Sequence, residues 1–129
     1  MCYESVYGEY CTGYIQKGAQ LLCVITNDAW WGDTPGYRQH LSYSRLRAIE
    51  TRRDIARSAN TGISAIINQR GDLVEKSSWL VPASISSEVK LSKKITPYVK
   101  YGDISGKVCS FVFLLLAAWL LVSFITRRD

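Results

Sequence analysis

The sequence has few of the side chains that bind metal ions. Its 129 residues include one histidine and four cysteines, and no two cysteines form a C-x-x-C pair. A zinc site is therefore not expected. Cys109 lies within an apolar run, and the other three cysteines are an odd, widely spaced set. Such a set does not predict a disulfide framework.

A strong excess of charge is also absent. Lysine and arginine number 16 against 11 acidic residues, which gives a net charge of +5. Six arginines lie between Arg38 and Arg57, and the other basic residues are dispersed. This is weak support for nucleic acid, and we expect no such partner. The six arginines are expected mostly on a solvated helix face, although some of them are placed to touch lipid phosphates.

The composition indicates a folded chain. Hydrophobic residues make up 47% of the sequence, charged residues 21% and aromatic residues 12%. These values exclude a disordered or collagen-like protein, and the length allows one domain of ordinary size.

One long hydrophobic run decides the class. The 19 residues Val108–Thr126 carry no charge. As a helix they would extend about 28 Å, close to the thickness of a bilayer's hydrocarbon core. A buried core helix is the alternative, but such a helix normally keeps a polar face. Lys107 precedes the run and Arg127 and Arg128 follow it, which favours a cytoplasmic C-terminus with residues 1–107 outside.

Residues 1–107 predict an α/β pattern. Apolar residues near helical spacing indicate a helix from Cys2 to about Gly18. The continuous apolar run Leu21–Thr26 predicts a buried strand in the centre of a sheet. A loop follows over residues 29–36, and a long helix is expected from Tyr37 to about Ile55.

The second half of this region predicts mainly extended structure. Residues 57–60 are expected to be extended. Strands over 63–67 and 73–78, joined by a tight turn, predict a hairpin. Residues 79–85 and 88–94 are further extended segments, and residues 97–103 form a loop before the apolar helix. A central strand with so few partners before it indicates the back half of a larger domain.

Several motifs together resemble a known family. They are Cys2-Tyr3-Glu4, the strand ending at Asn27-Asp28-Ala29-Trp30-Trp31-Gly32, Gln39-His40, residues 45–50, residues 57–65, and residues 96–103 followed at once by the apolar helix. Their order resembles the carbon–nitrogen hydrolase (nitrilase) superfamily, and within it the apolipoprotein N-acyltransferase branch. The resemblance covers essentially the whole chain. One departure is Trp31, where the family usually has phenylalanine.

The resemblance implies an architecture and a place in the cell. It implies residues 1–104 as the C-terminal part of a nitrilase-type α-β-β-α sandwich, a linker at 105–107, a transmembrane helix at 108–126 and a cytoplasmic tail at 127–129. The protein would be integral to the bacterial inner membrane, with its catalytic part on the periplasmic side.

The resemblance also implies a reaction. An acyl chain would pass from a phospholipid to a cysteine thiol, and then to the N-terminal amine of a diacylated lipoprotein. No cofactor is implied, and the full-length form would be a monomer. The family's glutamate base and lysine precede its cysteine by a long stretch and have no counterpart here. We therefore expect a match to the C-terminal quarter of such an enzyme, and no activity from this chain alone.

The residues at the start of the chain are the expected catalytic group. Cys2 is the expected nucleophile, because a thiolate is a good nucleophile and leaving group and its pKa falls at a helix N-terminus. Residue type alone favours an inert thiol near a terminus for Cys2, and the resemblance favours the nucleophile. The resemblance makes Tyr3 and Glu4 supporting residues. Glu4 accepts a hydrogen bond or orients the amine, or is simply a carboxylate favoured in a first helical turn.

Several of the remaining candidates have more than one interpretation. Asn27 and Asp28 end a strand, where α/β sites lie, but they also suit a turn. Trp30 and Trp31 form an acyl-chain wall, enter the membrane interface or pack in the core. His40 is expected to be structural, and Cys11 and Cys23 are expected to be small core residues.

Two other functions stay open. One is a membrane-tethered nitrilase or amidase that uses water as the acceptor. The other is a catalytically inactive, truncated remnant that keeps only the anchor.

Overall fold

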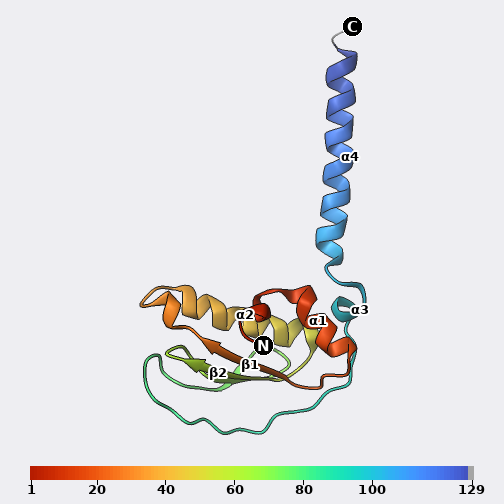
Figure 1. The fold of residues 1–129 in the computed structure, drawn as a ribbon. Coiled ribbons are helices and arrows are strands. Elements are labelled where there is room, and N and C mark those ends of the chain that lie inside the picture. The colour runs from red at the N-terminus through yellow and green to blue at the C-terminus, as the bar shows by residue number, and fades with distance from the viewer. Residues whose placement is uncertain (128–129) are drawn as a thin grey trace.

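The structure, a computed structural model, describes residues 1–127. Helices cover one face of a four-stranded sheet, and one long helix projects away from them (Figure 1). The expected mixed α/β fold is confirmed. The elements are η1 (Tyr3–Val6), α1 (Gly8–Gln16), β1 (Leu22–Asn27), η2 (Ala29–Trp31), α2 (Gly36–Thr51), β2 (Ile55–Asn60), β3 (Ala65–Ile67), β4 (Leu73–Lys76), α3 (Pro97–Tyr101) and α4 (Ile104–Thr126).

The sheet has the order β1-β2-β3-β4. β1 and β2 are parallel, and the remaining pairs are antiparallel, so the expected β3–β4 hairpin is confirmed. β1 was expected in the centre, but it lies at an edge of the sheet that the described residues form. Beside that edge, the Met1 carbonyl accepts from the Ile25 N–H and the Met1 amino group donates to the Cys23 carbonyl.

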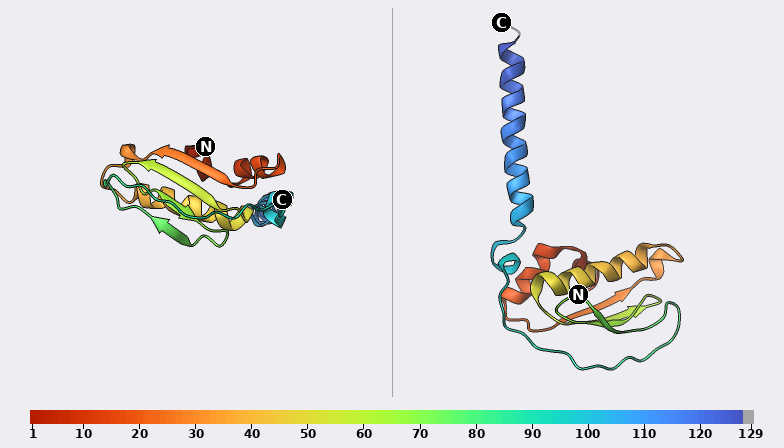
Figure 2. Two further views of the ribbon diagram at one scale, coloured as in Figure 1. Left: turned by 90° about the horizontal axis from the view of Figure 1, so that it is seen from below. Right: turned by 180° about the vertical axis from the view of Figure 1, so that it is seen from behind.

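Burial alternates along β1 instead of being continuous. Leu22, Val24 and Thr26 are buried, whereas Cys23 and Ile25 are exposed. The reason is that the helices cover only the face on which the first three lie (Figure 2). The expectation that Cys23 is a core residue is therefore wrong, while Cys11 is fully buried as expected.

The hydrophobic core lies between the sheet and the helices. α1 contributes Ile15, and α2 contributes Leu41 and Ala48. The sheet contributes the alternate residues Leu22, Val24, Ile55, Ala65 and Ile67, and Val99 comes from α3. Burial of this apolar surface is the main force that holds the helices to the sheet.

Two helix boundaries differ from the sequence prediction. α2 ends at Thr51 because Arg52 adopts a left-handed conformation (φ 51°). Glycine usually takes this conformation at a helix end. Because an arginine takes it here, no glycine or proline in the sequence marked the end of α2. Residues 97–103, expected as a loop, include α3, whose first residue is Pro97 and whose N-cap Thr96 accepts from the Val99 N–H at 3.1 Å.

A coil of residues 77–96 runs below the sheet, on the side away from the helices (Figures 1 and 2). The buried side chain of Arg53 holds its far end by donating to the Lys94 carbonyl at 2.8 Å and to Ser92 Oγ at 3.3 Å. Asp54 adds a carboxylate that accepts from the Lys90 N–H at 2.6 Å. These contacts hold the extended coil against the domain without strand pairing.

The long helix α4 has no residue buried in the domain. It is long and apolar enough to cross a membrane, with a mean hydropathy of 2.7 over its most apolar window. It begins at Ile104, so residues 105–107 form its first turn and are not a separate linker. Of the expected tail at 127–129, residues 128 and 129 lie outside the described residues.

Replacing Arg53 with methionine should release the coil. Arg53→Met keeps the aliphatic stem but removes the donors that hold residues 92–94. Hydrogen bonds from charged donors contribute about 1.5–3 kcal/mol, so trypsin should cleave at Lys90, Lys93 or Lys94 at least about ten times faster. The rate is measured by limited proteolysis and mass spectrometry.

The control is Arg70→Met, because Arg70 is exposed and forms an ion pair with the exposed Asp72. Its cleavage rate at the same lysines should not change. Equal rates in both variants would show that Arg53 does not hold the coil.

Candidate functional site

The thiol of Cys2 lies beside the carboxyl end of β1. Its Sγ is 3.2 Å from Oγ1 of Thr26, the last buried residue of that strand. Cys2 is exposed and immediately precedes η1, with backbone angles φ −118° and ψ −112°. The sequence predicted one helix from Cys2 to about Gly18, but the structure divides it into the 3₁₀ turn η1 directly after Cys2 and the α-helix α1, with the extended residue Tyr7 between them.

Glu4 supports the backbone of Cys2. Its Oε2 accepts from the Cys2 N–H at 2.7 Å. This hydrogen bond, and a second from the N–H of Glu4 itself, hold the pKa of the Glu4 carboxyl below its ordinary value. This backbone hydrogen bond agrees with the structural interpretation of Glu4 as a first-turn carboxylate, while its roles at the acyl site stay predictions.

Tyr3 has an exposed ring beside the same turn. The ring lies 5.8 Å from the His40 imidazole, centroid to centroid, and 6.3 Å from the Tyr7 ring. Tyr3 therefore covers the outer side of a buried polar cluster.

The centre of that cluster is Asp28, which is almost completely buried. One carboxylate oxygen lies 2.8 Å from His40 Nδ1, and the other accepts from Arg57 Nη2 at 2.7 Å. Thr26 Oγ1 donates to the same carboxylate at 3.4 Å, which links it to the Cys2 thiol. His40 Nε2 lies 3.3 Å from Ser5 Oγ, so the network returns to η1 just after Cys2.

Electrostatics explain why these charges are stable in the interior. Burial by itself raises the pKa of Asp28, but the hydrogen bond from His40 and the charge of Arg57 outweigh it. The net result is an Asp28 pKa below the ordinary value, so the carboxylate is ionised at neutral pH. Burial lowers the pKa of Arg57, and the neighbouring Asp28 opposes this effect. Arg57 also donates to Ser44 Oγ and to the Ile63 carbonyl.

The loop after β2 approaches this cluster closely at Gly62. A Cβ atom at Gly62 would overlap the Asp28 carboxylate. Only glycine therefore allows the segment Asn60-Thr61-Gly62 to pass over Asp28.

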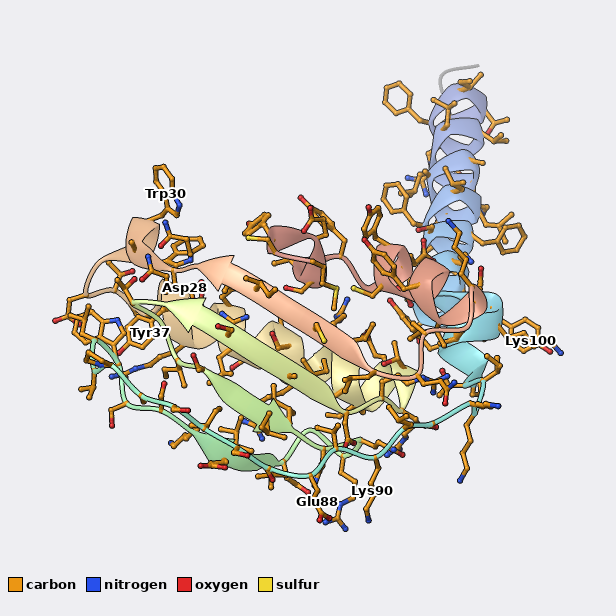
Figure 3. All side chains as sticks on the ribbon, turned by 60° about the horizontal axis from the view of Figure 1, so that its bottom comes forward. Asp28, Trp30, Tyr37, Glu88, Lys90 and Lys100 are labelled. Carbon is orange, nitrogen blue, oxygen red and sulfur yellow. The ribbon has the colours of Figure 1, made fainter. Side chains whose placement is uncertain are left out.

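The structure sorts the sequence candidates into two groups. Cys2, Tyr3, Glu4 and Asp28 meet in one place, and His40 joins them as a buried residue. Trp30 projects into solvent with 87% of its surface exposed (Figure 3), so core packing is excluded for it. Asn27 is exposed at the strand end and its Oδ1 accepts from the Ala29 N–H, which is turn chemistry.

Trp31 occupies a different position from Trp30. It is partly exposed, and its ring lies where a Cβ atom at Gly36 would overlap it. The ring therefore packs on the first turn of α2, while Asp28, Ala29 and Gly32 line a small groove with Trp79 and Leu80.

Sequence reasoning missed three buried arginines. Arg47, Arg53 and Arg57 were expected on a solvated helix face, but each has less than 5% of its surface exposed. Arg57 alternates with Ile55 on the buried face of β2, and this alternation was the available signal. Thr26 was also missed as a contact of the thiol; its position on the buried face of β1 was the signal.

The arrangement suits covalent chemistry at sulfur. An exposed thiol at the end of a strand and the start of a helical turn can attack a carbonyl carbon and hold the acyl group as a thioester. Among residues 1–127, no group of three histidine, cysteine or acidic side chains lies together in a way that could hold a metal ion.

Comparison with known proteins identifies the family. The sequence model described as carbon–nitrogen hydrolase matches residues 1–93. A protein of Nitrosomonas europaea named apolipoprotein N-acyltransferase is 40% identical over 128 residues, which is 99% of this chain and 25% of that protein. Proteins of the same name from Wigglesworthia glossinidia brevipalpis and Chlorobaculum tepidum are 33% and 34% identical over 100% and 99% of the chain. The chain spans about a quarter of the length of the curated relatives it matches.

Replacing Asp28 with asparagine should destabilise the domain in a pH-dependent way. Asp28→Asn leaves buried Arg57 without its counter-charge, which typically costs about 3–5 kcal/mol. Since the folded pKa of Asp28 is lowered, its stabilising effect is complete above the unfolded value of about 3.9 and is lost as the pH falls through the folded pKa. The deficit should therefore be largest at neutral pH and shrink below about pH 4.

Urea unfolding at several pH values in detergent micelles measures this deficit. The control is Asp33→Asn, because Asp33 is exposed in the loop before α2, and it should leave stability nearly unchanged. A deficit for Asp28→Asn that is the same at pH 3 and pH 7 would contradict the assignment of Asp28 as a paired carboxylate.

Proposed function

This chain belongs to the carbon–nitrogen hydrolase family, and we propose that it carries the nucleophile-bearing part of an apolipoprotein N-acyltransferase. The observation that carries the proposal is that relatives of that name align with almost the whole chain, from the Cys2 turn through α4. Family membership alone supports a cysteine nucleophile. The alignment across the apolar helix supports this branch over soluble members.

In the proposed reaction Cys2 accepts the acyl chain first. Its thiolate attacks the ester carbonyl of a phospholipid, a carbon–sulfur bond forms, and the ester carbon–oxygen bond breaks. The lysophospholipid leaves as an alcohol after it takes up a proton. The carboxylate of Glu4 keeps the Cys2 turn in place by accepting the Cys2 N–H, and Thr26 Oγ1 orients the sulfur.

In the second step the acyl group leaves sulfur. The N-terminal amine of a diacylated lipoprotein attacks the thioester carbonyl, a carbon–nitrogen bond forms, and the carbon–sulfur bond breaks. The amine loses a proton to a base and Cys2 returns as a thiolate. The glutamate base and the lysine that the resemblance implies would be supplied from outside these 129 residues. A general base typically contributes about 10²–10⁴-fold, so the chain alone is expected to be inactive.

The proposed reaction needs the thiol near a membrane. The length and hydropathy of α4 support a transmembrane span. Lys107 before the apolar run and Arg127 and Arg128 after it support a cytoplasmic C-terminus, with the thiol on the periplasmic side.

Hydrolysis is the second candidate. The family model itself is described as a carbon–nitrogen hydrolase. A membrane-tethered amidase would form the same covalent adduct on Cys2 but release it to water. The two reactions therefore differ in the acceptor, which the experiment must vary.

Replacing Cys2 should abolish the acyl-enzyme. We would place residues 1–129 in the matching quarter of the Nitrosomonas europaea relative and incubate the chimera with labelled phospholipid. Cys2→Ala should lose all labelled adduct because the other thiol near this turn, that of Cys11, lies 3.7 Å from the Glu4 carbonyl and is fully buried. Cys23→Ala is the matched control, because Cys23 is also exposed but lies on the opposite face of β1.

Mass spectrometry of the labelled peptide reads the position of the adduct. An adduct that persists in Cys2→Ala, or maps to Cys11 or Cys23, would overturn the assignment. Adding a diacylated lipopeptide should transfer the label to its amine, whereas release of free fatty acid without transfer would favour the hydrolase. The 129-residue chain alone should restore no lipoprotein acylation in cells that are depleted of their own enzyme.

The C-terminus should lie in the cytoplasm. A reporter that is active only in the cytoplasm, fused after Asp129, is expected to be active. The reciprocal fusion, with a reporter active only after export, should be silent. The opposite pattern would reverse the orientation, and release of the chain from membranes by alkaline carbonate would exclude a span.

A further inference from the structure

Four tyrosines form one exposed stripe along η1 and α1. Tyr10 and Tyr14 are four residues apart on α1 and therefore share one helix face, whereas Tyr3 lies in η1 and Tyr7 is the extended residue between η1 and α1. Between 39% and 60% of each side chain is exposed. The rings meet in two edge-to-face pairs, Tyr3 with Tyr7 and Tyr10 with Tyr14.

The outer face of α1 is unusual for a helix that faces water. Such a face is normally covered by charged side chains, yet Glu9 is the only charged residue within α1. Tyrosine has an apolar ring and a polar hydroxyl, so it suits a boundary where one side is apolar and the other is wet. Tyrosine and tryptophan are accordingly enriched at the interface between a membrane and water.

The tyrosine stripe adjoins the first turns of α4. Tyr7 and Tyr10 line a groove of about 710 Å³ together with Phe111 and Leu114 of that helix. Glu9 of α1 holds the two helices together: its Oε1 accepts from the Asp103 N–H at 3.0 Å and lies 3.7 Å from Lys107 Nζ. Phe111 and Leu114 belong to the first two turns of the uncharged run.

We propose that the tyrosine stripe, with the groove that it shares with α4, is a contact surface for the headgroup region of a phospholipid bilayer. The proposal rests on the proposed function in one respect, because it takes α4 as a membrane span. The helix layer lies on the same side of the sheet as α4, whereas the coil of residues 77–96 lies on the far side (Figure 2). A bilayer crossed by α4 therefore lies on the side of the sheet that carries the helices and their tyrosines.

The height of the groove agrees with this arrangement. The apolar run begins at Val108, so Phe111 lies one helical turn inside the hydrocarbon edge, at a depth of about 5 Å. Tyrosine rings beside Phe111 would therefore lie near the boundary between the headgroups and the hydrocarbon core, where aromatic residues are enriched. Cys2 directly precedes Tyr3, so the same contact would bring the exposed thiol to the membrane surface.

Photocrosslinking of the full chain in vesicles tests the surface. Benzoylphenylalanine would replace one residue at a time in the 129-residue chain, reconstituted in vesicles of phosphatidylethanolamine and phosphatidylglycerol. Tyr10 and Tyr14 report the stripe, and Phe113, an exposed residue of α4, reports the span. Leu91, an exposed apolar residue of the coil on the far side of the sheet, is the control.

The expected result is a phospholipid adduct at Tyr10, Tyr14 and Phe113, at least about ten times more abundant than at Leu91. An adduct at Phe113 with Tyr10 and Tyr14 no higher than Leu91 would overturn the surface while the span stands. No adduct at Phe113 would reject the span, and Tyr10 and Tyr14 would still decide whether the stripe binds the vesicle. A crosslink from Tyr10 to a second copy of the chain, in place of lipid, would also overturn the proposal.

Discussion

The ion pair between Asp28 and Arg57 is the interaction on which the candidate site depends. The two side chains lie 2.7 Å apart and are almost completely buried. Taking two charges out of water costs several kcal/mol for each ion unless both are paired and hydrogen-bonded. Here His40, Ser44 and Thr26 supply those further bonds. The end of β1, the start of α2 and the turn of Cys2 are thereby held in one arrangement.

The thiol and the long helix are held by different parts of the molecule, yet α1 joins them. The turn of Cys2 leads directly into α1, and Glu9 of α1 contacts the residues at which α4 begins. The tyrosine stripe lies along this connection. Under the proposed function, this connection would place the thiol near the bilayer that supplies the acyl chain.

Sequence reasoning succeeded where the signal was local. The β3–β4 hairpin was predicted because a glycine, Gly71, follows Asn68 between two apolar runs, and in the structure Gly71 has φ 81° in that turn. The apolar helix was predicted because 19 uncharged residues admit few other structures. The end of α2 was misjudged because Arg52 carries the left-handed conformation that glycine normally marks. β1 lies at an edge of the sheet that the described residues form, and its burial alternates because an apolar run does not reveal that only one of its faces is covered.

The sequence by itself determined the family, the mixed α/β class, the long apolar helix and the cysteine that begins the first helical turn. These follow from periodicity, composition and motifs, which neighbouring residues carry. Only the tertiary structure decided which polar groups share a space. In the chain, His40 lies 12 residues and Arg57 lies 29 residues after Asp28. Only the parallel pairing of β1 with β2 under α2 brings the three side chains together. Burial then decides their chemistry, because a charge removed from water is stable only beside the partner that the fold supplies.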